Sequence, residues 1–324
     1  MAFAEGKESH FVEAARGGGH RWWRYLVGLA VIISFYVVGA GAATMFIASA
    51  IGGRGEEVGI FLGQGDLSAL GPVSEFAALM LSNVFFLAGI LVTVTLIHRR
   101  HPRTLVTARE KVSWRRIGHG FVAIFVPWSL ILVLGQYLLY PETFAFTSDL
   151  ATFALFAPVA LVLIAIQTTT EELFCRGYLV QATSLIWANR LFLALVPAVV
   201  FALLHLGNPE AEAGGWLTMV LFYFLGPGLA WTIVSLVDGT TELAIGAHFA
   251  FNAVYFVVVN PIGGVITTPA LFTVSEYHST LYALSAVSVI PVFLAISYGV
   301  FRREPRRIGS RSNGNGRIDH PVDV

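Results

Sequence analysis

A small set of ionisable and amide side chains lies within long apolar stretches of the sequence, where such groups are uncommon. The set comprises Glu171, Glu172, Arg176, His205, His248 and Asn252. Burying an isolated carboxylate in hydrocarbon costs several kcal/mol, so ionisable residues at these positions are candidates for function. The chemistry that this set can perform is therefore the first question that the sequence raises.

Helical spacing separates the two adjacent glutamates. Glu172 and Arg176 are four residues apart, so on a helix they share a face and can form an ion pair. Glu171 is rotated from Glu172 by about 100° and has no such partner. The spacing predicts a structural pair, Glu172–Arg176, and a free carboxylate at Glu171.

The same four-residue spacing occurs in two further apolar stretches. His248 and Asn252 share one stripe of a helix, and Phe201 and His205 share another. A carboxylate that faces an imidazole can hold a water between them and remove its proton as the water attacks an amide carbonyl. A second imidazole with an amide NH2 supplies donors to the developing oxyanion, each worth roughly 3 kcal/mol in other enzymes. These groups suffice for peptide hydrolysis.

The same residue types also match a catalytic zinc site. Such a site has three protein ligands and an open fourth position, and here it would use Glu171, His205 and His248. Asn252 is a poor zinc ligand but a good oxyanion donor. Its place one turn after His248 makes sense if that histidine points at substrate rather than at an ion. We favour a site without a metal or other cofactor, with zinc as the alternative.

The elements that carry these residues are predicted membrane helices. Charged residues make up 12% of the chain and hydrophobic residues 56%, whereas a soluble domain has about 25% charged residues. Apolar runs recur that are long enough to cross the ~30 Å hydrocarbon core, which needs about 20 helical residues. We predict an all-α, polytopic membrane helix bundle with about eight transmembrane helices, at 25–50, 76–97, 117–139, 155–185, 191–206, 216–237, 241–259 and 281–300.

Positions along the predicted hairpins place the candidate residues at similar depths. The fourth and fifth helices turn near Ala188, and Glu171 and His205 each lie 17 residues from that turn. At 1.5 Å per residue both reach about 25 Å from the turn, provided that the fourth helix is unbroken. His248 and Asn252 follow a second hairpin by nine and 13 residues, so the four side chains can converge.

Basic residues are distributed unevenly over the connectors. Eighteen of the 20 Lys and Arg residues fall on one side of the predicted bundle, whereas the opposite connectors hold only Arg54. Because basic connectors stay in the cytoplasm, we place both termini there. The chain then divides into a cytoplasmic N-terminal tail (1–24), a transmembrane catalytic bundle (25–301) and a cytoplasmic C-terminal tail (302–324).

Several function classes are disfavoured by composition and position. The net charge of zero removes any general electrostatic case for nucleic acid, and the single cysteine, Cys175, cannot form an internal disulfide. The segment Gly63-Gln64-Gly65-Asp66 matches the GxGD pattern of intramembrane aspartyl proteases. It lies in an external connector with no partner aspartate in a helix, so we do not assign it a catalytic role.

Three short motifs carry a family resemblance. Residues 170–178 read TEELFCRGY and contain EExxxR, residues 201–205 match FxxxH, and residues 248–252 match HxxxN. In this order, each on its own apolar stretch, they make the chain resemble the CAAX-protease and bacteriocin-processing (CPBP) family of intramembrane endopeptidases over about residues 150–260. The resemblance implies that Glu171 and His205 activate water and that His248 and Asn252 form the oxyanion hole. It implies supporting roles for Glu172, Arg176 and Phe201.

The implied function is hydrolysis of a peptide bond at or in the membrane, by a glutamate-type or a metal-dependent mechanism. The expected partners are the lipid bilayer and a peptide or membrane-protein substrate, with or without an attached lipid, and the expected location is a prokaryotic cell membrane. The alternatives are a non-catalytic membrane scaffold or partner protein, a proton-coupled transporter, and a polar lock in which Glu–Arg and His–Asn pairs bridge helices. Convergence of the set around a cavity favours the enzyme, whereas direct pairing without a cavity favours the lock.

The charge asymmetry predicts that both termini face the cytoplasm. Reporter fusions at the N- and C-termini, active only on one side of the membrane, should both give the cytoplasmic signal. An extracytoplasmic C-terminus would contradict both the orientation and the depth estimates.

Overall fold

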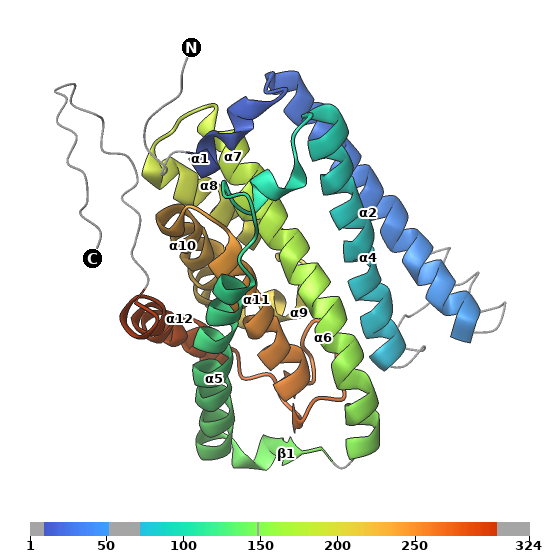
Figure 1. Ribbon diagram of the computed structural model, residues 1–324. Helices are drawn as coiled ribbons and strands as arrows, with labels where there is room; N and C mark the ends of the chain where they lie inside the picture. Colours follow the sequence, from blue (N-terminus) through green and yellow to red (C-terminus); the bar gives the residue numbers. More distant parts are fainter. Residues whose placement is uncertain (1–9, 52–71, 148, 303–324) are drawn as a thin grey trace.

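The computed structural model describes residues 10–51, 72–147 and 149–302, which are almost entirely helical (Figure 1). The helices are α1 (His10–Glu13), α2 (Trp22–Ile51), α4 (Pro72–Val92), α5 (Trp114–Leu139), α6 (Leu150–Glu172), α7 (Val180–Ser184), α8 (Arg190–Leu203), α9 (Pro209–Leu217), α10 (Trp231–Asp238), α11 (Glu242–Ala253) and α12 (Ser279–Leu294). The GxGD segment and the tail 303–324 lie outside the described residues.

Many of these helices continue through segments with a different hydrogen-bond pattern. Single turns of 3-10 helix lie at Ala14–Gly17, Pro102–Leu105 and Pro141–Thr143. Segments of π-helix lie at Thr93–Ile97, Leu173–Leu179, Thr218–Ala230, Val254–Val258 and Ala295–Val300. Since π-helical segments occur frequently at functional sites, the one that begins directly after Glu172 marks the region of interest.

Apolar helices of membrane-spanning length account for most of the described chain. Six are long and apolar enough to cross a bilayer: Trp22–Ile47, Pro72–Ile97, Trp114–Leu139, Leu150–Ser184, Pro209–Asp238 and Ser279–Val300. Two apolar helices are shorter, Arg190–Leu203 and Glu242–Val258. The predicted all-α membrane bundle of about eight helices is therefore confirmed. At 1.5 Å per residue, α8 reaches only about 21 Å, so the connector after it begins inside the span of its neighbours.

The helices are arranged so that the motif-bearing ones lie at the centre. In Figure 1, α2 and α4 run side by side along one edge of the molecule, and α6 follows them inward. Helix α11 packs against both α5 and α6, and α8 contacts the π-helical segment between α9 and α10. At the N-terminal end, α1 packs on α7 and the side chain of Phe11 is buried. Part of the predicted N-terminal tail is thus attached to the bundle.

The α5–α11 pair holds the helix that bears the HxxxN motif. Trp128 of α5 stacks on Phe251 of α11 with ring centroids 3.7 Å apart, and its indole NH donates to the Ser285 hydroxyl at 3.1 Å. Near the N-terminal ends of both helices, a Cβ atom on Gly120 would overlap the Leu243 carbonyl oxygen, and one on Gly246 would overlap that of Ile117. Small residues at these positions let the two backbones approach closely, as membrane helices do where they pack most tightly.

A three-stranded sheet closes one end of the bundle, an element that the all-α prediction did not include. Its strands are β1 (Phe144–Phe146), β2 (Val259–Pro261) and β3 (Phe272–Val274), in the order β1-β3-β2. Strand β1 pairs antiparallel with β3, and β2 pairs parallel with β3. The buried amide of Asn260 bonds to the backbone of the β2–β3 loop, so the loop is held against the helices. Hydrogen bonds from Thr152 lower the pKa of Asp149, which caps α6 beside this sheet.

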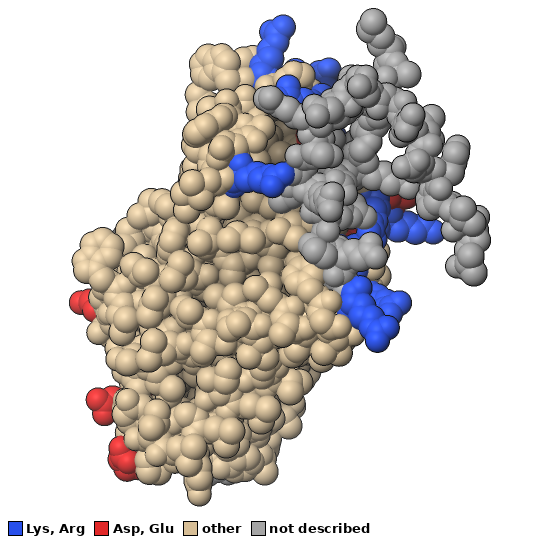
Figure 2. Space-filling view, turned by 90° about the vertical axis from the view of Figure 1, so that its left-hand side faces the viewer, with Lys and Arg blue, Asp and Glu red and all other residues tan. Residues whose placement is uncertain are grey.

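Charged side chains gather at the two ends of the molecule. Figure 2 shows Lys and Arg, with acidic atoms beside some of them, at the top and on one edge of the surface, and acidic side chains along the opposite edge, with a broad uncharged surface between them. Arg116 of α5 bridges Asp238 and Glu242 across the α10–α11 turn, at 3.0 Å from Glu242. This distribution suits helices that cross a bilayer, because their charged ends stay in water while the middle is apolar.

The close approach of α5 and α11 predicts different effects at two glycines of the same helix. Gly120→Ala should lower the free energy of unfolding by roughly 1–3 kcal/mol, because the added methyl group must displace the backbone of α11. Gly118→Ala is the matched control, since its Cβ would meet nothing within 4 Å. Thermal unfolding in detergent micelles measures both variants. Equal stability of the two would contradict the tight contact.

Candidate active site

The π-helical segment after α6 carries a fully buried ion pair. Arg176 donates to Glu172 at 2.8 Å, and both side chains are 0% exposed. The guanidinium also donates to Thr232 at 3.2 Å and to the carbonyl oxygens of Gly228 and Pro227. Burial of a charge is tolerated when it is paired and its other donors are satisfied, as they are here. The pair predicted from the four-residue spacing is present.

His248 lies between the two glutamates. Its Nδ1 is 2.7 Å from the Oε1 atom of Glu172, and its Nε2 is 3.6 Å from Oε2 of Glu171. Because Glu172 also accepts from Arg176, the natural donor toward it is an Nδ1–H group of His248. The ion pair therefore orients this imidazole, which is 2% exposed, toward Glu171.

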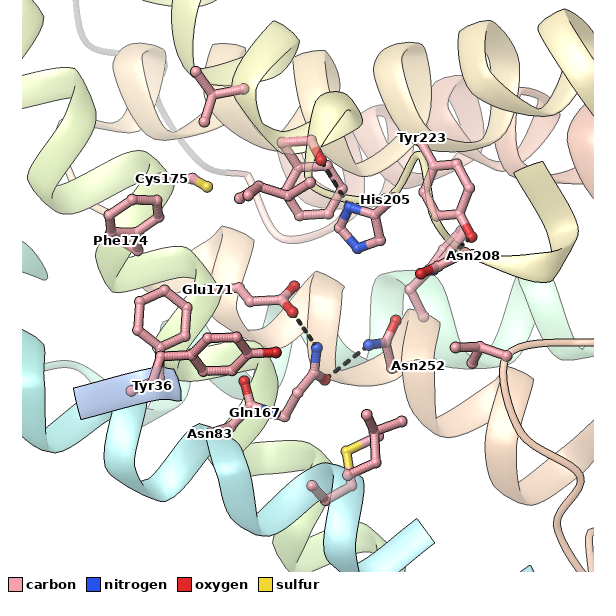
Figure 3. A pocket seen from close by; sticks show the side chains of 18 of the residues that line it. Tyr36, Asn83, Gln167, Glu171, Phe174, Cys175, His205, Asn208, Tyr223 and Asn252 are labelled. Carbon is pink, nitrogen blue, oxygen red and sulfur yellow. Dashed lines mark hydrogen bonds between the residues drawn. The ribbon is translucent and has the colours of Figure 1, made fainter. Parts of the chain in front are cut away.

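Gln167 connects α6 to α11, and the sequence analysis did not identify it. Its amide NH2 donates to Oε1 of Glu171 at 2.6 Å, and its carbonyl oxygen accepts from Asn252 at 2.9 Å (Figure 3). Gln167 stands one turn before Glu171, so the four-residue spacing that identified Glu172–Arg176 could also have found it. The Oε2 atom of Glu171 has no hydrogen-bond partner among the described residues.

His205 lies in the turn that follows α8. Its Nδ1–H donates to the Phe201 carbonyl oxygen at 2.7 Å, and its ring stacks on Tyr223 with centroids 4.7 Å apart. This bond assigns the proton of the neutral imidazole to Nδ1 and leaves a lone pair on Nε2. Figure 3 shows Nε2 on the side of the ring that faces Glu171 and Asn252. The Cζ atom of Arg176 lies 4.8 Å from the centroid of the Phe201 ring, so Phe201 contacts both His205 and Arg176.

These side chains surround a cavity of about 460 Å³. Glu171, His205 and Asn252 line it, together with Gln167 and a majority of apolar side chains from α2, α4 and α11. The predicted convergence of the candidate residues therefore occurs, with His248 in contact with Glu171. Among the alternatives, a lock without a cavity does not describe this arrangement, because Glu171, His205 and Asn252 line a cavity as well as contacting neighbouring side chains.

Glu210 also lines the cavity, although it falls between the predicted helices 191–206 and 216–237, where a carboxylate is expected to be in water. It stands in the first turn of α9 and is 2% exposed. Its Oε1 atom accepts from the Tyr255 hydroxyl and from the Val265 NH at 2.7 Å. The short α8 explains the difference, because the connector after it turns back into the bundle rather than into water. The fifth apolar run is shorter than the about 20 residues that a membrane-spanning helix needs, and this shortness was the signal in the sequence that the connector enters the bundle.

The predicted zinc ligands are not arranged around a common point. In the described part of the chain, no group of three or more His, Cys, Asp or Glu side chains is placed to hold a metal ion. Instead, the Oε1 atom of Glu171 accepts a hydrogen bond from Gln167, and the Nδ1 atom of His248 is bonded to Glu172. The donor set of Glu171, His205 and His248 therefore does not fit zinc in this geometry.

Comparison with known proteins agrees with the motifs. The family model of Rce1-like type II CAAX prenyl endopeptidases matches residues 152–254, which include every candidate residue named from the sequence. The uncharacterized protein YyaK of Bacillus subtilis strain 168 is 30% identical over 285 residues, covering 86% of this chain and 92% of YyaK. No solved structure matches the chain. With a relative that covers nearly its whole length and a matching family model over its motif helices, this integral membrane protein belongs to the Rce1-like CAAX-protease family.

Proposed function

We propose that this protein is an intramembrane endopeptidase in which Glu171 and His205 activate a water molecule for attack on a peptide bond. The observation that carries the proposal is the cavity within the apolar bundle, which the Glu171 carboxylate and the His205 imidazole both line, with the proton of that imidazole assigned to Nδ1. A substrate peptide, with or without an attached lipid, can reach such a cavity from the membrane.

The geometry suggests how the groups divide the reaction. Water bound between the Glu171 carboxylate and Nε2 of His205 loses a proton to the carboxylate as its oxygen attacks the carbonyl carbon. The NH2 group of Asn252 uses one hydrogen for Gln167 and keeps the other for the oxyanion. Collapse of the tetrahedral intermediate breaks the C–N bond, and the proton held by Glu171 passes to the leaving amine.

Glu172 and Arg176 act on this chemistry through His248. The buried pair holds the imidazole by its Nδ1 atom and directs Nε2 to the reacting carboxylate. When protonated, His248 donates from Nε2 and can stabilise either Glu171 or the oxyanion beside Asn252. Glu172, Arg176 and Gln167 are thus positioning residues in the proposal, since they reach the substrate only through others.

A site without a metal suits this arrangement better than a zinc centre, as the donor positions described above indicate. A proton-coupled transporter and a non-catalytic partner protein remain the competing functions. The arrangement of Glu171, His205 and Asn252 around one cavity favours hydrolysis, because these side chains supply the general base, the imidazole that binds water and the oxyanion donor.

The proposal predicts separate effects for the two glutamates. Glu171→Gln should reduce cleavage of an internally quenched peptide library by about 100-fold or more, since it removes the general base, and should leave the unfolding temperature unchanged. Glu172→Gln should lower the free energy of unfolding by roughly 3 kcal/mol, because Arg176 stays buried without its counter-ion. Proteoliposomes with purified protein provide both measurements.

Glu212→Gln is the matched control for this pair, since Glu212 is exposed on α9. It should change neither activity nor stability. Full activity of Glu171→Gln would show that the assigned base is wrong, and absence of any cleavage by the wild-type protein would favour the non-catalytic functions.

The metal-free mechanism predicts that activity survives chelation. Purified active protein should contain no stoichiometric zinc, and treatment with a chelator should leave cleavage of the same library unchanged. Elemental analysis and a chelation and add-back series measure this. Stoichiometric zinc whose removal and return switch activity off and on would overturn the mechanism in favour of a metalloprotease.

A further inference from the structure

Glu210 is a second carboxylate in the wall of the cavity, and the proposed reaction does not use it. It is 2% exposed, yet it forms no salt bridge to Lys, Arg or His within the described residues. One oxygen, Oε1, receives the hydrogen bonds of Tyr255 and Val265, whereas Oε2 is buried without a partner among those residues. A buried carboxylate in this state has capacity for a donor that the described residues do not supply.

The composition of the cavity indicates which donor would be favoured. The residues that line it include two carboxylates, Glu171 and Glu210, and no Lys or Arg. Three tyrosines, Tyr36, Tyr223 and Tyr255, line the cavity with Glu210, and the Tyr255 hydroxyl donates to this carboxylate. A carboxylate in a site of low polarity attracts an ammonium or guanidinium group, because charge-assisted hydrogen bonds are strong there. A substrate group with a negative charge would be repelled there.

The position of Glu210 relative to the catalytic groups is also defined. Tyr223 stacks on His205 at 4.7 Å and accepts a hydrogen bond from Asn208 at 3.0 Å, two residues before Glu210. Glu210 thus lies two residues along the chain from a side chain that contacts the ring stacked on His205. A group bound by Glu210 would share the cavity with the groups that are proposed to attack the carbonyl.

We infer that Glu210 forms a subsite for a cationic side chain, lysine or arginine, of a substrate peptide next to the bond that is cleaved. The subsite rests on the proposed function for its role in cleavage, although binding itself requires no turnover. A purely structural role would use only the bonds to Tyr255 and Val265, which hold the β2–β3 loop. The two roles differ in whether the charge of Glu210 matters, because glutamine can accept the same two bonds.

Two matched probes isolate that charge. N-dodecanoyl-lysine amide and N-dodecanoyl-norleucine amide have the same chain lengths and differ in the terminal ammonium. The wild-type protein in detergent should bind the lysine probe at least about ten-fold more tightly, as expected for a hydrogen bond to a charged group. Glu210→Gln should remove this preference, while Glu212→Gln and Glu171→Gln should retain it. Microscale thermophoresis measures the four proteins.

A second measurement locates the ammonium without any variant. Carbodiimide coupling of the lysine probe to wild-type protein, followed by peptide mapping, should modify Glu210. Equal affinity of the wild-type protein for both probes, a preference that survives Glu210→Gln, or coupling at Glu171 alone would each overturn the subsite. Because these readouts measure binding, an inactive protein would contradict the endopeptidase proposal without affecting them.

A lipid amine is the other source of the same chemistry, and nanodiscs distinguish it. Wild-type protein should have equal unfolding temperatures in phosphatidylethanolamine and phosphatidylcholine discs. Higher stability with phosphatidylethanolamine that disappears in Glu210→Gln would assign the site to a lipid headgroup and overturn the assignment to a peptide.

Discussion

The buried guanidinium of Arg176 is the interaction on which the rest of the site depends. A cation with 0% exposure inside an apolar bundle requires a full set of acceptors. It takes them from Glu172 on its own helical segment, from Thr232 of α10, and from carbonyl oxygens of the preceding π-helical segment. Its face is covered by Phe201 of α8. Three membrane helices are thereby held in one register.

That register determines what each neighbouring side chain can do. Glu172 is committed to Arg176 and His248, so Glu171, one residue earlier, is turned toward the cavity. Gln167, one turn before it, bridges Glu171 to Asn252 of α11. Helix α11 in turn is positioned by its close contact with α5. In an apolar bundle such a polar chain stays in order because each of its side chains is hydrogen-bonded to a neighbour.

The membrane class and part of the candidate site could be predicted from the sequence, because they follow from local spacing and hydrophobicity. The membrane class follows from apolar runs, and the Glu172–Arg176 pair follows from the four-residue period of a helix. The distances along two hairpins were enough to expect Glu171 and His205 at one depth. These inferences need only the geometry of single helices and the cost of burying charge.

Other features depend on how helices pack, which no local pattern encodes. The sheet of β1, β2 and β3 joins segments more than 100 residues apart, and strands of three residues have no recognisable period. Gln167 reaches Asn252, and His248 reaches Glu172, only when α6 and α11 come together. Glu210 reads as a solvated connector residue until the short α8 draws it into the bundle. The sequence thus determined which side chains are costly to bury, and the tertiary structure decided which of them share a cavity, because contacts between helices arise from the packing of whole surfaces.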